Sequence, residues 1–199
     1  MKLHVISTGR QSREELCTRV AAIEPMIDFF HLREKQWSAS EIAGTIDALT
    51  ELGFPTEKLV INDRVDVAVA KAVPHVQLAG HSLPVEEVKR AFPFLNVGCS
   101  VHSMEEAITA EKRGADFILF GHVFETASKP GLTGRGLEAL QRVTQAVSLP
   151  VTAIGGLKPE NVSRLQRSGA SGAAVLSGIL LADDAEEAVR RYRYRLGRR

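Results

Sequence analysis

The sequence contains little cysteine, no excess of either charge and no long apolar run. Only Cys17 and Cys99 are present, and neither belongs to a CxxC pair or to a Cys/His cluster with metal-ligand spacing, so both are expected to pack as small apolar residues. Lys and Arg number 25 against 24 Asp and Glu, and a formal net charge of +1 gives no global field to recruit nucleic acid or a membrane surface. No segment approaches about 18 uninterrupted apolar residues, so we expect no membrane anchor and a cytoplasmic protein.

What is present is a repeat of short apolar runs. The 199 residues, 44% of them hydrophobic, can bury one large core, which predicts a single domain over residues 1–199. Short β-branched runs alternate with longer stretches of helical period and predict strands at residues 3–7, 28–32, 58–62, 75–79, 96–100, 116–120, 151–154 and 172–176. This alternation favours an α/β fold, a closed (β/α)8 TIM barrel in which the carboxyl ends of the strands converge on one pocket.

Helical periodicity predicts helices over residues 38–52, 103–113, 137–147 and 159–167. Ser103 followed by Glu106 predicts a capping box, in which a hydroxyl and a carboxylate satisfy free amides of the first turn. Gly114 and Gly169 are expected to end two of these helices.

Glycine follows the last two predicted strands. Gly155 and Gly156 end the seventh run, and Leu176, Ser177 and Gly178 end the eighth. In this barrel the corresponding loops often bind phosphate, because glycine lets backbone amides approach an anion. The alternative is that these glycines only turn the chain, but their place at the ends of two consecutive strands favours a phosphate site.

Charged residues follow the second and third predicted strands. Arg33 and Lys35 close the second, and Asn62 and Asp63 close the third. Arg and Lys at strand ends can bind a phosphate or a carboxylate, although a charge run is more often a solvated face. For Asp63 we weigh a hard-cation ligand, a helix N-cap and a salt-bridge partner, and the last two together are favoured.

His122 is the foremost catalytic candidate among six histidines. It stands where the sixth strand gives way to a loop, and an imidazole can accept and return a proton at neutral pH. The adjoining Thr126, Ser128 and Lys129 are suited to hold an anionic group.

The other histidines carry less weight. His4 and His75 begin strands and are interpreted as structural residues at the bottom of the barrel. His31 is interpreted as a core imidazole that could also orient a pocket group. His81 and His102 lie in loops after strands and are weaker candidates for substrate contact.

Several strings together resemble the thiamine phosphate synthase superfamily over essentially the whole chain: HLREK at 31–35, INDRVDVA at 61–68, VGCSVHSMEEA at 97–107, GADFILFGHVFET at 114–126, AIGGL at 153–157 and GAAVLSGI at 172–179. The resemblance implies a thiamine phosphate synthase-like barrel. Within it, GHVFET and GLTGRG at 131–136 resemble the bacterial thiazole tautomerase branch.

The resemblance also implies roles for individual residues. It assigns the thiazole phosphate to Gly156, Leu176 and Ser177, the thiazole ring to Thr126, Ala127 and Ser128, and the pyrimidine pyrophosphate of the synthases to Arg33, Lys35, Asn62, Ser100 and Lys129.

The sequence departs from the synthase pattern at two places. His122 stands where synthases carry a proline, and Gly80, His81 and Ser82 replace the stretch with an acidic magnesium ligand. Because magnesium demands oxygen ligands in near-octahedral geometry, the loss of a carboxylate should weaken the metal site and argues against pyrophosphate displacement.

These departures predict a monofunctional isomerase. It would aromatise a 2-carboxy-dihydrothiazole ethylidene phosphate to the carboxythiazole phosphate, with His122 moving the proton and with no metal and no cofactor. Two alternatives remain, a thiamine phosphate synthase and a non-catalytic ligand-binding or regulatory protein. The expected partners are the small-molecule substrate and a second copy in a homodimer; the arginine-rich stretch at 190–199 is interpreted as a solvated helix end rather than a nucleic-acid site.

Overall fold

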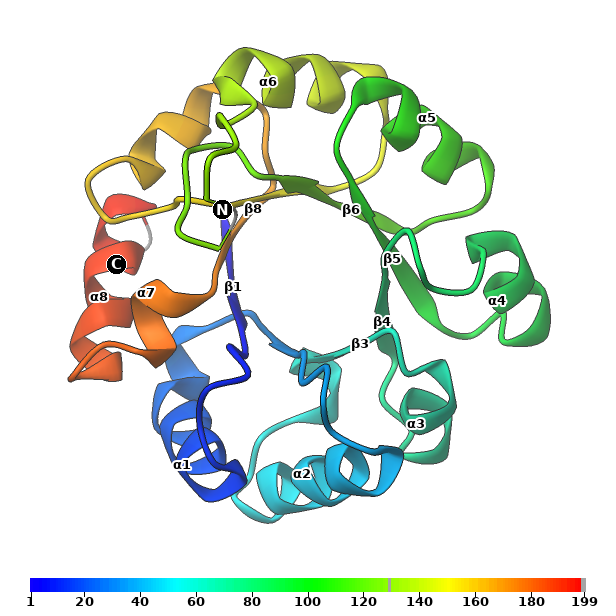
Figure 1. The fold of residues 1–199 in the computed structure, drawn as a ribbon, viewed down its shortest axis with the longest axis vertical. Helices are drawn as coiled ribbons and strands as arrows, with labels where there is room; N and C mark the ends of the chain where they lie inside the picture. The colour runs from blue at the N-terminus through cyan, green and yellow to red at the C-terminus, as the bar shows by residue number, and fades with distance from the viewer. Residues whose placement is uncertain (129, 198–199) are drawn as a thin grey trace.

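The computed structural model describes residues 1–128 and 130–197. Eight parallel strands form a closed barrel in sequence order, with β8 paired back to β1 (Figure 1). The strands are β1 Lys2–Ile6, β2 Phe29–Leu32, β3 Leu59–Asn62, β4 His75–Leu78, β5 Asn96–Val101, β6 Phe117–Gly121, β7 Val151–Ile154 and β8 Gly172–Val175. All eight overlap the predicted runs, with boundaries that differ by at most one residue, so the predicted TIM-barrel fold is confirmed.

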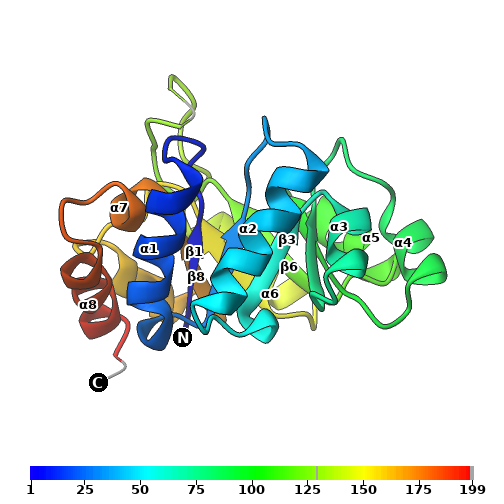
Figure 2. The ribbon, with the colours of Figure 1, turned by 90° about the horizontal axis from the view of Figure 1, so that it is seen from below.

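Helical segments surround the barrel as an outer layer (Figure 1). They are α1 Arg13–Ile23, α2 Ala39–Glu51, α3 Val65–Ala70, α4 Val85–Ala91, α5 Met104–Lys112, α6 Gly136–Ala146, α7 Ser177–Leu180 and α8 Ala185–Arg195, with 3-10 turns η1 Glu24–Met26, η2 Thr56–Lys58 and η3 Val162–Arg167. Figure 2 shows the segment between β6 and α6 rising above the carboxyl end of the barrel. In the part of the chain that the structure describes, no helix is long and apolar enough to cross a membrane.

Two local predictions require correction. The Ser103 hydroxyl accepts a hydrogen bond from the Glu106 amide at 3.1 Å, but the Glu106 carboxylate accepts from the His102 amide at 2.6 Å, so only half of the predicted capping box forms at Ser103. A complete, reciprocal box lies instead at Ser38 and Glu41 at the start of α2. The side chain of Glu106 thus accepts from the amide of the residue before the N-cap, whereas a capping box requires the amide of the N-cap itself.

The second correction concerns residues 159–167, which do not form an α-helix. Residues Val162–Arg167 form the 3-10 segment η3, in which the Arg164 amide donates to the Asn161 carbonyl three residues back. The segment ends before Gly169, whose φ of 78° is left-handed.

The side chains of β1 alternate between the two faces of the barrel wall. Leu3 and Val5 of β1 pack outward against the helices in the main hydrophobic cluster. The alternate residue Ile6 points into the barrel and packs with Leu119 and Ala174 in a small separate cluster. This period of two is the geometry of a strand. It places inward-facing residues beneath the carboxyl end of the barrel, where they form the floor of a cavity.

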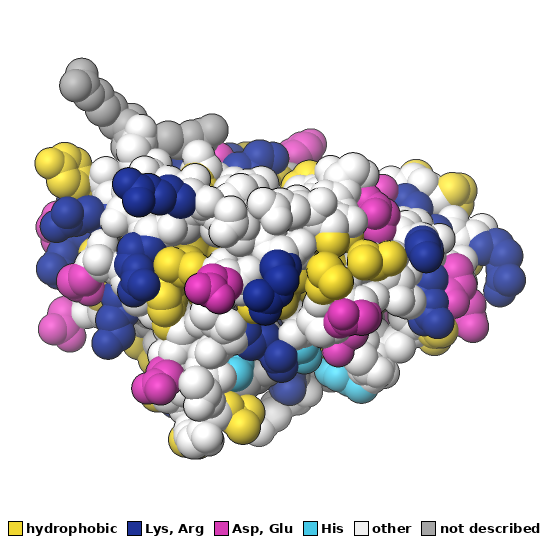
Figure 3. Space-filling view, turned by 90° about the horizontal axis from the view of Figure 1, so that it is seen from above, with side chains coloured by type: hydrophobic (Ala, Val, Ile, Leu, Met, Phe, Trp, Pro, Cys, Tyr) yellow, Lys and Arg dark blue, Asp and Glu magenta, His cyan; other side chains and the backbone are white. Residues whose placement is uncertain are grey.

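The last helix is held to the barrel by a partly buried ion pair. Arg193 Nη2 lies 2.7 Å from Asp28 Oδ2, and the exposed fractions of the two side chains are 14% and 18%. The Arg193 Nε also donates to the Met26 carbonyl. Arg193 is therefore not the solvated residue that the arginine-rich end suggested, whereas Tyr194 is 80% exposed. On the face shown in Figure 3, Lys and Arg side chains are interspersed with Asp and Glu side chains.

We expect Arg193→Leu to lower the free energy of unfolding by roughly 3 kcal/mol, because the change removes one partner of a partly buried ion pair. Urea denaturation followed by circular dichroism measures the change. Arg190→Leu is the matched control on the same helix, since its contacts to Glu186 and Glu187 are solvent-exposed, and it should cost less than about 0.5 kcal/mol. Equal losses in the two variants would contradict a special role for Arg193.

Candidate active site

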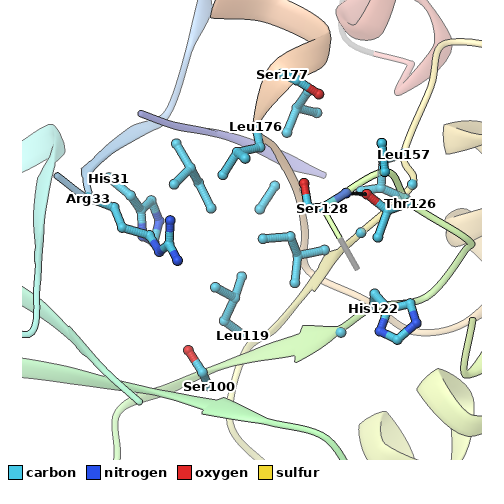
Figure 4. A pocket seen from close by; sticks show the side chains of 18 of the residues that line it. His31, Arg33, Ser100, Leu119, His122, Thr126, Ser128, Leu157, Leu176 and Ser177 are labelled. Atoms are coloured by element: carbon cyan, nitrogen blue, oxygen red, sulfur yellow. Dashed lines mark hydrogen bonds between the residues drawn. The ribbon is translucent and has the colours of Figure 1, made fainter. Parts of the chain in front are cut away.

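One cavity of about 900 Å³ opens at the carboxyl ends of the strands. It collects nearly all of the predicted site residues: Arg33, Lys35, Asn62, Ser100, His122, Thr126, Ala127, Ser128, Gly156, Leu176 and Ser177. Lys129 lies outside the described residues. Figure 4 shows Arg33 on one side of the pocket, with Thr126 and Ser128 across from it and Ser177 between them at the edge. Residues far apart in the sequence thus share one site because parallel strands end at the same edge.

The β2 side of the cavity carries two cations. The Arg33 amide donates to the Ser7 hydroxyl at 2.7 Å, which ties the start of this loop to β1. Glu34, between the cations, is buried, and its carboxylate accepts from the Gly9 amide at 3.2 Å. Arg33 and Lys35 line the cavity and Glu34 does not, so the two cations give this side of the cavity its positive charge.

The β7 side of the cavity has glycines that the packing requires. Gly155 and Gly156 have φ of 99° and 64°, which L side chains rarely adopt. A Cβ on Gly155 would lie 2.3 Å from the Cβ of His122, and one on Gly156 would lie 2.3 Å from the Glu125 carbonyl oxygen. The glycine pair therefore allows the loop after β6 to lie directly on the loop after β7. Phosphate binding by this pair and Ser177 stays a prediction.

His122 is buried and held by the segment before α6. Its Nε2 lies 3.2 Å from the Leu132 carbonyl oxygen. A carbonyl can only accept, so Nε2 is the donor in this hydrogen bond. Nδ1 is buried and has no hydrogen-bond partner among the described residues. His102 adds a second link to this region, because its Nδ1 donates to the Gly121 carbonyl at 2.6 Å.

Asp63 does not have the role expected for a helix cap. The N-cap of α3 is Arg64, which makes no capping hydrogen bond through its side chain. Asp63 has a left-handed φ of 66°, and its Oδ2 lies 3.9 Å from His81 Nε2. Of the two favoured interpretations of Asp63, the helix cap is thus wrong, whereas a salt-bridge partner has a candidate in His81.

Several polar residues of the cavity were not predicted from the sequence, among them Gln77. Gln77 of β4 is buried and lines the cavity, and its amide nitrogen donates to the Ser100 hydroxyl at 3.1 Å. Its oxygen Oε1 has no hydrogen-bond partner within the described chain. The sequence did contain a signal for Gln77, because it is a polar residue within the apolar run at 75–79. A buried amide needs hydrogen-bond partners, which apolar side chains do not provide.

The fold and this cavity define a class of protein, a parallel β/α barrel with polar and cationic side chains gathered at the carboxyl ends of its strands. The chain belongs to the thiamine monophosphate synthase family, whose sequence model matches residues 3–179. A thiamine-phosphate synthase from Pyrococcus furiosus is 36% identical over 97% of this chain and 93% of its own length. One from Chloroflexus aurantiacus is 33% identical over 94% and 87%. The structure of a thiamine phosphate pyrophosphorylase from Pyrococcus furiosus superposes with a TM-score of 0.86 at 34% identity, covering 98% of this chain and 95% of that one.

These comparisons confirm the superfamily and overturn the predicted branch. The relatives that match nearly the whole chain are named synthases, so the expectation of a thiazole tautomerase, an isomerase, is wrong. The error came from weighting His122 and His81, two local departures, above the similarity of the whole chain.

Proposed function

We propose that this protein is a thiamine-phosphate synthase, which joins a thiazole phosphate to a pyrimidine pyrophosphate and releases inorganic pyrophosphate. The observation that carries the proposal is a single cavity in which one side is cationic and the other consists of a glycine and a serine at strand ends. Arg33 and Lys35 lie on the β2 side, and Gly156 and Ser177 lie on the β7 and β8 side. The family of the chain and the names of its relatives support the same activity.

The size of the cavity suits two substrates. Pockets for a single drug-sized ligand span roughly 300–1,000 Å³, and this cavity, at about 900 Å³, lies near the upper end. One five-membered ring with its phosphate would leave much of that space to water. A second phosphorylated ring fills the space and brings the two rings together.

The reaction is a displacement at carbon. The thiazole ring nitrogen donates its electron pair to the methylene carbon of the pyrimidine, a C–N bond forms, and the C–O bond to pyrophosphate breaks. The electrons of that bond leave with the pyrophosphate, so the reaction is balanced without an oxidant or a reductant. Arg33 can offer a planar fork of donors and Lys35 a point charge to the leaving oxygens.

The residues present do not fit a magnesium site built from two carboxylates. Magnesium prefers oxygen ligands in near-octahedral geometry. His81 lies 3.9 Å from Asp63, and the carboxylate of Glu34, which lines the same small pocket, accepts from the Gly9 amide. In the described part of the chain, no group of three or more His, Cys, Asp or Glu side chains could hold a metal ion. We therefore assign the charge of the leaving group to Arg33 and Lys35 and derive no step through a metal.

Incubation of the purified protein with both precursors should produce thiamine phosphate and pyrophosphate in equal amounts. Chromatography with fluorescence detection after oxidation measures the first product, and a coupled phosphate assay measures the second. Parallel reactions with millimolar magnesium and with a chelator test the metal dependence. Heat-denatured protein is the control, and absence of product under both conditions would reject the proposal.

A further inference from the structure

A chain of polar side chains crosses the barrel interior below the cavity. The inward-facing positions of such barrels are usually filled by branched apolar residues. Here His4 of β1, His31 of β2 and Thr152 of β7 are all buried, with exposed fractions of 6%, 2% and 4%. His4 Nδ1 lies 2.9 Å from His31 Nε2, and His4 Nε2 lies 3.4 Å from Thr152 Oγ1. We call these three residues the histidine chain.

The interior is shaped to hold this chain. A Cβ on Gly172 of β8 would lie 2.8 Å from Thr152 Oγ1 and 3.1 Å from His4 Nε2, so the glycine leaves the room in which these two groups meet. The His4 ring also packs on Phe29, with 4.8 Å between ring centroids. His4 is thus a fixed link in the barrel interior, in keeping with the structural role predicted for it.

Burial keeps both rings neutral. Burial, with the charge of Lys2 acting in the same direction, lowers the pKa of His4 to about 3. Burial is also the main cause that lowers the pKa of His31 well below its usual value, followed by the proximity of His4. At neutral pH each ring therefore has one nitrogen that donates and one that accepts.

Two arrangements of the histidine chain satisfy every link. In the first, Thr152 donates to His4 Nε2, His4 Nδ1 donates to His31 Nε2, and His31 Nδ1 carries a proton. In the second, His31 Nε2 donates to His4 Nδ1, His4 Nε2 donates to the Thr152 oxygen, and His31 Nδ1 has a free lone pair. A hydroxyl can serve both arrangements because it rotates and has both a proton and lone pairs. The two contain the same number of protons.

We propose that His31 is a recognition residue whose Nδ1 presents either a donor or an acceptor to the bound ligand. The tautomer of His4 changes together with the tautomer of His31. Nε2 of His31 is used by His4, and His31 lines the cavity, so Nδ1 is the polar atom that its ring has left for a ligand. The ligand shifts the population toward the arrangement that it binds better.

The position of His31 indicates which part of a ligand it meets. His31 lies on β2 and Arg33 directly follows the end of this strand, two residues further on, and both line the cavity. Figure 4 shows the two side by side. An anionic group held by Arg33 would therefore leave an attached neutral nitrogen heterocycle against His31. This inference rests on the proposed function for the identity of that heterocycle, the aminopyrimidine.

Nuclear magnetic resonance of protein labelled with ¹⁵N in histidine tests the proposal, because protonated and unprotonated ring nitrogens have well-separated shifts. The probes are the pyrimidine pyrophosphate and its 4-oxo analogue, in which the donor and acceptor positions of the ring are exchanged. We expect opposite tautomers of His31 with the two probes, the same change at His4, and affinities within about tenfold of each other. An identical tautomer of His31 with both bound probes, or a His4 tautomer that does not follow, would overturn it.

Two variants break the histidine chain in different ways. His4→Phe keeps a ring against Phe29 but removes the link to His31, and Gly172→Ala places a methyl group between His4 and Thr152. In both, the ratio of the two probe affinities should change about tenfold, the value of one hydrogen bond to a buried group. His75→Phe, another histidine that packs on Phe29, is the matched control and should leave the ratio unchanged. An unchanged ratio in His4→Phe and Gly172→Ala also overturns the proposal. Failure of thiamine phosphate formation, with the tautomer change intact, would reject the proposed function and not this inference.

Discussion

Arg33→Met should lower kcat/KM for thiamine phosphate formation about 100-fold. Hydrogen bonds to charged groups contribute roughly 1.5–3 kcal/mol, and a guanidinium can make two of them to a pyrophosphate. The change removes the charge and keeps an apolar stem of similar length. Its effect on the fold should be small, because the Arg33 amide, and not the side chain, makes the bond to Ser7. Steady-state kinetics with the pyrimidine pyrophosphate as the varied substrate measures the loss.

Two comparisons make the Arg33 result specific. Arg33→Lys should recover only part of the rate, because lysine supplies the charge without the planar fork. Arg90→Met, which removes an exposed cation on α4, is the matched control and should keep the full rate. A loss of less than about fivefold in Arg33→Met would mean that the leaving pyrophosphate is held elsewhere.

Gly156→Ala should lower the free energy of unfolding by about 3 kcal/mol or more. Two effects add: a left-handed backbone costs an L residue roughly 1–2 kcal/mol, and the new Cβ would lie 2.3 Å from the Glu125 carbonyl oxygen. The loop after β6 must therefore move, and overpacking of this kind typically costs a further 1–3 kcal/mol. For a protein of this size, we expect a fall in Tm of roughly 6–12 °C.

Gly53→Ala separates the two effects of Gly156→Ala. Gly53 has a similar positive φ of 84°, but a Cβ added there would meet no atom within 4 Å, so only the backbone cost applies. It should lose about 1 kcal/mol. If both variants lost the same free energy of unfolding, the contact between the loops after β6 and β7 would contribute nothing to stability. Binding of inorganic phosphate to Gly156→Ala, measured by calorimetry, would then decide whether this loop also holds an anion.

The tautomerase prediction was wrong because it rested on a few residues of the candidate site. His122 lies in the cavity as predicted. The tautomerase branch inferred from His122 and from the Gly80 to Ser82 stretch was nevertheless wrong. The relatives match almost from end to end, and that similarity carries more weight than two substitutions.

The sequence by itself determined the barrel and the location of its site. Strands buried on both faces appear as continuous apolar runs, and a closed barrel brings the residues after each run to one rim, which is why Arg33, His122 and Ser177 could be placed together before their contacts were known. Only the tertiary structure decided the close approach at Gly156 and the link from His4 to Thr152. These contacts join residues of different strands and loops. The periodicity of one segment reports only which of its own residues are buried, and it does not say which side chain of another segment they contact.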